Sequence, residues 1–347
     1  MRPLILFLYR WLLLAKRSYR LLPDRFSRRS SAKGFTLIEL LVSLIISSIV
    51  VTGLLTVVVE ITTIDRREDN LNQVQRDMNR AMEYITDDLK EAVYVYPDPQ
   101  TVAVQLTADP SFPGGTGEVP VLAFWRIDPL ESLPDCTTGS TAFQAECSLL
   151  EIRQSAYTLV VYAQKVNDGN QNWSGQSRII RYELSKYSDL TNLTWRSGYR
   201  DPTDPDDALA TFETWQNNGN PSGSSAVLID YVQAPSFTPP VALYRAPLSD
   251  TGGACRAYGL DDNNNPLYDV VPTTATTTNN NSFFACVRNP AINGVVTSRG
   301  NQDVYVFLRG NVQGVTGGVR GYSDETSLPI LETQVLVKGV VNKNAGD

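Results

Sequence analysis

The chain has 347 residues, of which 37 are acidic, 30 are basic and none is histidine. A chain without histidine cannot form a Ser-His-Asp or Cys-His catalytic arrangement, nor a zinc site ligated by histidine. It also lacks the glycine motifs of nucleotide-binding loops and of serine hydrolases. Composition therefore argues against an enzyme, and a membrane-tethered enzyme is only a distant alternative.

The charge is unevenly divided along the chain. Residues 1–34 contain nine basic residues and one acid, a balance of +8, whereas residues 35–347 contain 21 bases and 36 acids, a balance of −15. Basic flanks of a membrane span stay in the cytoplasm, so we expect the acidic part to be exported. Its acidity disfavours nucleic acid as a partner. The apolar, basic segment 3–23 could lie on the inner membrane face, or it could be an extension without a role.

Residues 35–59 predict a transmembrane helix. At about 1.5 Å per residue this apolar segment can cross a hydrocarbon core of about 30 Å, and Glu39 is its only charged residue. A charge near the bilayer centre costs roughly 2.5–3.5 kcal/mol on insertion scales. We therefore expect the Glu39 carboxylate to have a partner.

Three ordinary explanations of this segment each miss a feature. A secretory signal has an apolar region of about 7–15 residues before its cleavage site, which is shorter than residues 35–59. Residues 27–35, SRRSSAKGF, contain paired arginines as in a twin-arginine signal, but serine and alanine follow where apolar residues are expected. A plain membrane anchor fits the length and leaves Glu39 without a purpose.

Residues 33–42, KGFTLIELLV, resemble the class III signal of the type IV pilin and type II secretion pseudopilin superfamily, a prepilin-type cleavage and methylation motif. In that family a prepilin peptidase cuts after the glycine and methylates the new N-terminal residue. The resemblance thus implies cleavage between Gly34 and Phe35 and N-methylation of Phe35. It also implies that Glu39, the fifth mature residue, docks against the N-terminal amine of a neighbouring subunit.

The implied docking contact agrees with elementary electrostatics. An α-amino group has an ordinary pKa of about 8 and is cationic at neutral pH. Its attraction to a carboxylate grows in a medium of low dielectric constant, where either charge alone is penalised. The alternative is that Glu39 merely extends towards the membrane interface from a position near the helix end.

A helical pattern continues beyond the span. Apolar residues recur from Ile61 to Val93 at spacings of three, four or seven residues, which predicts an amphipathic helix. Pro97 bounds this pattern, so we expect one helix from Phe35 to about Val93, about 88 Å long. The intervening charges indicate a solvated face, with opposite charges three residues apart in the pairs Asp77–Arg80 and Asp87–Lys90.

The remaining chain predicts β structure connected by polar loops. Short apolar or alternating segments are typical of strands, and they occur at residues 101–106, 119–125, 156–164, 178–184, 226–232, 303–309 and 333–341. Segments 197–225 and 261–282 are rich in Asp, Asn, Pro, Gly, Ser and Thr and predict surface loops. We expect an α+β, pilin-like fold, with a long N-terminal helix packed on an elaborated antiparallel sheet. The expected divisions are a leader 1–34, a span 35–59, a helix continuation 60–96 and an exported domain 97–347.

The size of the chain and the paired segments YTLVVYAQKV and SRIIRYELS resemble minor subunits of the J or W type. A narrower resemblance, based on size, Asn/Thr-rich loops and the ending TQVLVKGVVNKNAGD, is to the hormogonium polysaccharide secretion pseudopilins of filamentous cyanobacteria. Thr56 stands where major pilins often carry proline, so we expect no melted segment in the helix. Gly53 is the only weak point within the span.

The four cysteines all lie on the expected exported side, where oxidation favours disulfides. Four cysteines allow three pairings, and proximity favours Cys136 with Cys147 and Cys255 with Cys286. Free buried thiols are the alternative. The spacings are not those of a zinc site.

One segment has a weak resemblance to a calcium loop. Asp261, Asn263 and Asn265 have the 1, 3, 5 spacing of oxygen ligands, but Pro266 and Pro272 replace the glycine and glutamate of an EF-hand. An ordinary Asx-rich turn is the alternative, and no other cofactor is expected.

Two functions agree with these features. The first is a minor pilin or pseudopilin that primes or caps a short type II secretion or type IV pilus-like filament, for polysaccharide secretion and gliding motility. The second is a tip adhesin or cargo-recognition subunit that binds a polysaccharide, a surface or a secreted protein. The implied partners are the prepilin peptidase, other pilins, a cytoplasmic ATPase and the inner-membrane assembly platform. The implied location is the inner membrane, with one span, a cytoplasmic N-terminus and a periplasmic C-terminal domain.

Overall fold

A computed structural model describes residues 34–114, 117–130, 132–167, 172–204, 207, 209–236, 255–261, 263–276, 279–289, 291–292, 295–296, 301–312 and 328–340. Leader residues 1–33 lie outside the described residues. Two compact units divide the chain, the first ending at Glu60 and the second beginning at Ile61. Each unit is described by itself below.

The first described helix, α2, spans Leu37–Lys90. Its start is set by Thr36, whose hydroxyl oxygen accepts a hydrogen bond from the Glu39 backbone N–H at 3.3 Å, an N-cap contact. The helix passes Gly53 and Thr56 without a break. The Thr56 hydroxyl donates to the Gly53 carbonyl at 2.8 Å, and the expectation that this segment does not melt is confirmed.

The end of the helix differs from the prediction, which placed it at about Val93. Helix α2 stops at Lys90, and strand β1, Ala92–Val95, follows. The sequence AVYV consists largely of β-branched and aromatic residues, which favour strands. Backbone pairing of Ala92, Tyr94 and Val95 with β2 replaces the last helical turn, and Val93 lies at an irregularity in this pairing.

The other helices are α3 (Gln100–Leu106) and α4 (Thr141–Arg153), with a 3₁₀ helix η2 (Arg256–Tyr258). The described strands are β2 (Glu118–Pro129), β3 (Ser155–Val166), β4 (Ser177–Ser185), β5 (Tyr187–Asp189), β6 (Thr194–Trp195), β7 (Ser224–Val232), β8 (Tyr268–Val271), β9 (Phe283–Arg288), β10 (Ala291–Ile292), β11 (Val295–Val296), β12 (Asn301–Leu308) and β13 (Leu331–Val340). Six of the seven predicted strands are confirmed.

The strands form two main antiparallel sheets where one elaborated sheet was expected. The five-stranded sheet has the order β1-β2-β3-β4-β7, and the four-stranded sheet has the order β13-β12-β9-β8. Two small hairpins, β5-β6 and β10-β11, complete the described pairings. The α+β class with a long N-terminal helix and antiparallel sheets is confirmed.

Residues 101–106, predicted as a strand, form helix α3 instead. Asp98 lies just before this helix, and its carboxylate accepts a hydrogen bond from the Gln100 N–H at 3.0 Å. The buried residues Val102, Ala103 and Leu106 lie on one helical face. In a segment of six residues, apolar positions do not distinguish the helical period of 3.6 from the strand period of two. The turn at Asp98 therefore decides that the segment forms a helix.

The predicted loops also contain structure that was missed. Strand β8 lies within the expected loop 261–282, and β9 follows it. Within the expected surface loop 197–225, Tyr199 and Trp215 are buried and pack against Trp125. Helix α4 was not predicted, although the Ser140 hydroxyl caps it by accepting the Phe143 N–H.

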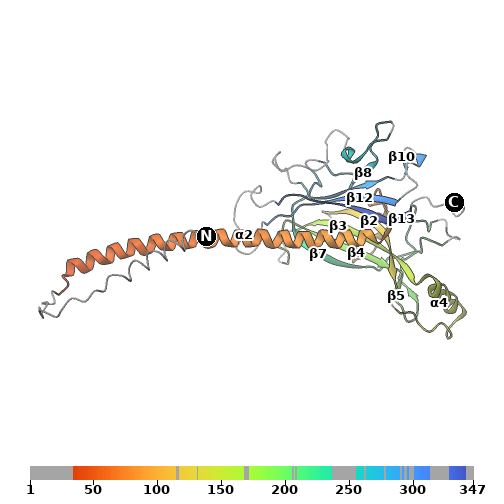
Figure 1. Ribbon diagram of the computed structural model, residues 1–347. Coiled ribbons are helices and arrows are strands. Elements are labelled where there is room, and N and C mark those ends of the chain that lie inside the picture. The colour runs from red at the N-terminus through yellow and green to blue at the C-terminus, as the bar shows by residue number, and fades with distance from the viewer. Residues whose placement is uncertain are drawn as a thin grey trace, which may run out of the picture. The chain divides into compact units, whose positions relative to one another are not determined.

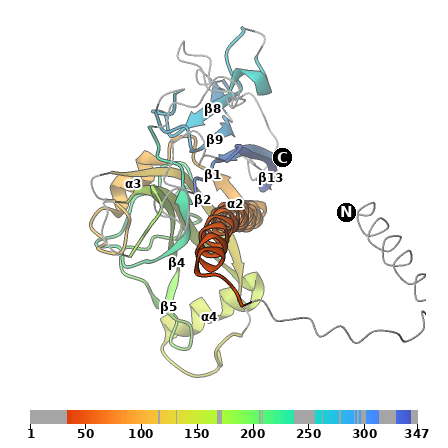
Figure 2. The same cartoon turned by 90° about the vertical axis from the view of Figure 1, so that its left-hand side faces the viewer.

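Two hydrophobic clusters lie on opposite faces of the five-stranded sheet, and alternate side chains of its central strands point into one or the other. In β2, Leu122 and Phe124 belong to the cluster with α2, whereas Ala123 and Trp125 belong to the cluster with α3. This is the period of two expected of a buried strand. Figure 2 shows α2 and α3 on opposite faces of the five-stranded sheet.

Two contacts join the sheets where β1 meets the four-stranded sheet. The Gln302 side chain accepts from the Val95 N–H at 2.9 Å and donates to the Val95 carbonyl at 3.0 Å, so it pairs with β1 as a backbone would. A Cβ atom at Gly339 would lie 1.8 Å from the Val93 carbonyl oxygen. Glycine is therefore required where β13 crosses β1.

Candidate functional site

The first candidate site is the docking segment, defined here as residues 34–59. All of its residues are exposed, and α2 contains a window with a mean hydropathy of 2.5 and none of its residues buried. Continuous apolar exposure of this length is typical of a segment that contacts lipid or the apolar segments of other subunits. Length and composition make α2 a candidate membrane span.

Gly34 and Phe35 precede the helix. A Cβ atom added at Gly34 would meet no heavy atom of the described residues within 4 Å, so no packing of this chain requires a glycine there. Phe35 is 77% exposed. Within the described residues no contact therefore requires a small side chain at position 34.

Glu39 lies in the first turn of α2. The positive end of the helix dipole favours an acid at this position. The side chain is exposed, and within the described part of the chain its carboxylate has no ion pair or hydrogen bond. This acid is thus available to a group from another molecule.

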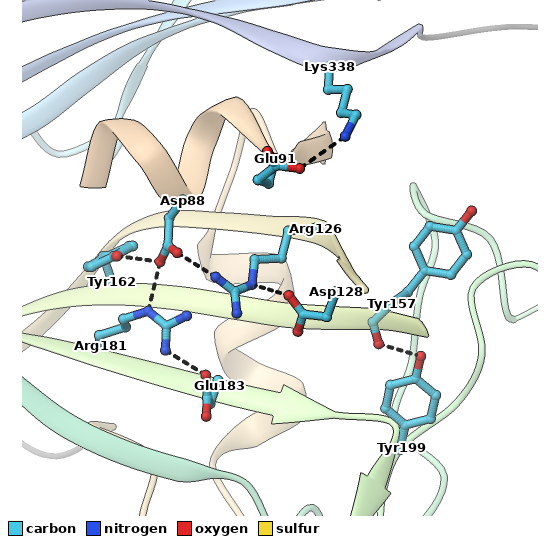
Figure 3. A network of polar contacts seen from close by, with 10 residues as sticks. All are labelled: Asp88, Glu91, Arg126, Asp128, Tyr157, Tyr162, Arg181, Glu183, Tyr199 and Lys338. Atoms are coloured by element: carbon cyan, nitrogen blue, oxygen red, sulfur yellow. Dashed lines mark hydrogen bonds and ion pairs between the residues drawn. The ribbon is translucent and has the colours of Figure 1, made fainter. Parts of the chain in front are cut away.

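The second half of α2 carries a buried acid that the sequence analysis missed. Asp88 is 6% exposed and receives three contacts from three strands, shown in Figure 3. Arg126 of β2 lies 2.5 Å from Oδ1, while Arg181 of β4 and the Tyr162 hydroxyl of β3 lie 2.7 and 2.6 Å from Oδ2. These contacts fasten the helix to the sheet, and we call this group the Asp88 anchor.

Two further acids in Figure 3 extend the anchor, each beside one of its arginines. The Asp128 carboxylate forms an ion pair with Arg126 at 2.7 Å from its Nε, and Glu183 accepts from an η-nitrogen of Arg181 at 2.6 Å. Burial raises the pKa of Tyr162, and the neighbouring Asp88 raises it further. Burial alone would lower the pKa of Arg181, but hydrogen bonds to Asp88 and Glu183 outweigh it and raise that pKa.

A sequence signal for the anchor existed in the helical pattern. Asp88 follows Ile85 by three residues and precedes Leu89, and both apolar residues are fully buried. An acid on the apolar side of an amphipathic helix requires a buried partner. By contrast, the predicted surface pairs are confirmed, with distances of 3.7 Å for Asp77–Arg80 and 2.9 Å for Asp87–Lys90.

The cysteines form two disulfides, Cys136–Cys147 and Cys255–Cys286, with Cα–Cα distances of 5.4 and 5.7 Å. These are the pairs that proximity predicts. The first links the chain before α4 to α4 itself, and the second links the residue before η2 to β9.

The weak calcium candidate forms a local turn. The Asp261 carboxylate accepts from the backbone N–H groups of Asn263 and Asn265 at 2.9 and 2.7 Å, and from the Asn265 side-chain amide at 3.0 Å. These hydrogen bonds lower the pKa of Asp261. This arrangement is that of the Asx-rich turn given above as the alternative, and calcium binding stays a prediction. In the described ranges no group of three or more Cys, Asp or Glu residues is arranged to hold a metal ion.

Residues 29–55 match the family model described as the prokaryotic N-terminal methylation motif. This match supports the type IV pilin and pseudopilin class, in which prepilin peptidase processes the subunits and the partners are other pilins or pseudopilins. Together with the apolar helix it is consistent with a single-pass membrane anchor. No curated protein and no solved structure matches the chain.

Proposed function

We propose, starting from the pilin and pseudopilin class that the motif supports, that this chain is a minor subunit that primes or caps a short type II secretion or type IV pilus-like filament. The peptidase cuts between Gly34 and Phe35 and methylates Phe35, and the docking segment then enters the filament core. The domain from residue 97 onwards stays on the periplasmic side of the inner membrane.

The observation that carries this proposal is the exposed Glu39 carboxylate. It lies in an apolar segment, and no described residue of its own chain pairs with it. The N-terminal amine of a neighbouring mature subunit supplies the missing positive charge. Within the filament core the pair is shielded from water, which strengthens its attraction.

The finer assignment, to a J or W type subunit of a machine for polysaccharide export and gliding motility, draws support from the sequence resemblance. Gene neighbourhood tests it. Adjacent prepilin-like genes together with glycosyltransferase genes support polysaccharide export, whereas other secretion or pilus components support the general alternatives.

Neutralising the docking acid tests the assembly role. In the cells that produce the protein, we expect Glu39→Val chains to be cleaved and membrane-resident but poorly crosslinked to other pilin-like subunits. Breaking a fully desolvated pair costs about 3–5 kcal/mol, and less near the interface. Glu60→Val, an exposed acid on the same helix, is the matched control and should crosslink normally. If the Glu39→Val chain crosslinks as well as the wild type, Glu39 is not the docking group and the segment is a plain membrane anchor.

A further inference from the structure

A cavity of about 440 Å³ lies between α4, the start of β3 and the β5-β6 hairpin. Its volume falls within the range of about 300–1,000 Å³ typical of small-ligand sites. Figures 1 and 2 show α4 and β5 at the end of the domain opposite β8. The lining includes Glu146, Arg153, Tyr157, Lys186, Trp195 and Asp201.

The buried ammonium of Lys186 in this cavity is already compensated by two acids. The Lys186 ammonium lies 2.8 Å from a Glu146 oxygen and 2.9 Å from an Asp201 oxygen. Asp201 also accepts from the N–H and the hydroxyl of Thr203 at 3.0 and 2.7 Å. The lining has three acids and two bases, so its net negative charge disfavours an anionic ligand. A cationic ligand would have to compete with Lys186 for the carboxylates of Glu146 and Asp201, so the cavity favours a neutral ligand.

Trp195 provides an aromatic surface at the cavity. Its side chain is 41% exposed, the Lys186 ammonium lies over the ring at 4.5 Å from the centroid, and the Tyr199 ring meets it edge-on at 6.0 Å. These contacts hold the indole in one orientation. The π-face of an indole is electron-rich, and the C–H groups on one face of a sugar ring pack on such a surface.

Hydrogen-bond donors and acceptors line the same cavity as the indole. Arg153 supplies guanidinium donors. The hydroxyls of Ser155 and Thr203 already donate to the Arg153 carbonyl and to Asp201, so they can accept from a ligand, and the Glu146 carboxylate can also accept beside its contact with Lys186. Neighbouring sugar hydroxyls also donate and accept, so they can satisfy both kinds of group. A purely apolar ligand would cover the Arg153 guanidinium and the Glu146 carboxylate without offering either a hydrogen bond.

We propose that this cavity binds a neutral saccharide unit, which stacks on Trp195 and forms hydrogen bonds with Arg153 and Glu146. The site is preformed, because Glu146 precedes Cys147 and the Cys136–Cys147 bond restrains that part of α4. The Tyr199 hydroxyl also donates to the Tyr157 backbone carbonyl at 2.8 Å, which connects the segment after β6 to β3. This inference goes beyond the assembly role, since none of these residues lies in the docking segment.

Binding is tested with the full processed chain in a zwitterionic detergent, because a sugar-headgroup detergent would compete for the site. The probes are maltotetraose, cellotetraose, chitotetraose and a tetragalacturonate, observed by saturation-transfer NMR and titration. We expect at least one neutral tetrasaccharide to bind. Trp195→Ala should weaken that binding by about tenfold, a difference readily measured, and Trp195→Phe by less.

Trp173→Ala is the matched control, because Trp173 packs on Arg178 and does not line the cavity. It should bind like the wild type. Binding of the tetragalacturonate alone, abolished by salt, would overturn the proposal in favour of charge attraction. Absence of binding to every probe, or equal binding by wild type and Trp195→Ala, would also overturn it. Saccharide binding by the Glu39→Val chain should be normal, which separates this result from the assembly test.

Discussion

Each half of α2 places an acid among apolar side chains, Glu39 in the first half and Asp88 in the second, and the two acids meet opposite conditions. Glu39 is exposed and lacks a partner within the described part of its own chain. Asp88 is buried and receives two arginines and a tyrosine. Asp88 therefore attaches the helix to its own domain, whereas for the exposed Glu39 we propose intermolecular docking.

The difference follows from what surrounds each half. Between Leu71 and Leu89 the apolar side of α2 packs on two sheets, so a buried acid there must find its compensation within the domain. Residues 37–64 expose their apolar side chains, including Ile61 and Ile64, which were expected to continue the packed face. An acid in that half remains available until another molecule covers it.

The largest effect is expected from Gly34→Glu, which acts on the docking half alone. A bulky charge replaces the small residue at the peptidase cut, so maturation should stop and the chain should keep its 34-residue leader on a gel. The domain should remain folded, as limited proteolysis would check, because nothing in the described chain contacts this position within 4 Å. A variant that runs at the processed size would refute the cleavage assignment.

The anchor half is tested by Asp88→Ala. Removing the acid leaves Arg126 and Arg181 without their shared partner, and loss of one member of a buried ion pair costs about 3–5 kcal/mol. Denaturant unfolding should show this loss in the free energy of unfolding. Asp87→Ala is the matched control, since its side chain is 64% exposed and a surface pair contributes about 0–1 kcal/mol. Equal stabilities of the two variants would contradict the anchor.

The disulfides stabilise parts of the domain that do not belong to the Asp88 anchor. Thiol labelling of the unfolded, unreduced chain should find no free cysteine, and stoichiometric labelling of all four would exclude both bonds. The bonds join residues 11 and 31 positions apart, and the chain-entropy model assigns them about 3 and about 4 kcal/mol. Replacing each pair by alanine should therefore cost less for Cys136 and Cys147 than for Cys255 and Cys286.

The smallest effect is expected from pH acting on Asp109, a buried acid outside the anchor. Burial raises its pKa, but hydrogen bonds from Ser111, Tyr182 and the Gly223 N–H outweigh burial and hold the pKa below its ordinary value of 3.8. Below this ordinary value the unfolded chain binds more protons than the folded one. Stability is thus present above pH 3.8 and is lost as the pH falls through the lower folded pKa.

Asp109→Asn should reduce the stability at neutral pH and flatten the acid limb of the stability curve. Ser111→Ala, which removes the hydroxyl donor and keeps the carboxylate, should give an intermediate slope. Unfolding curves measured between pH 2 and 7 check both. A slope unchanged in Asp109→Asn would show that other acids carry the acid sensitivity.

Local features of the sequence sufficed for the docking segment and for most strands. The motif at residues 33–42 and the apolar length of residues 35–59 depend only on neighbouring residues, and the period of two identifies β2, β3 and β4 because their alternate side chains face different clusters. The disulfide partners followed from proximity along the chain in the same way.

Tertiary structure decided the features that depend on distant residues. Helix α2 ends before Val93 because β1 finds a partner in β2, and Asp88 is compensated by residues 38 and 93 positions away. The cavity beside Trp195 combines α4 with strands on both sides of β4 in the sequence. Residue spacing along one chain cannot specify such contacts, because they form only when separate elements pack. Each buried polar group is then stabilised by the side chains that the packing places beside it.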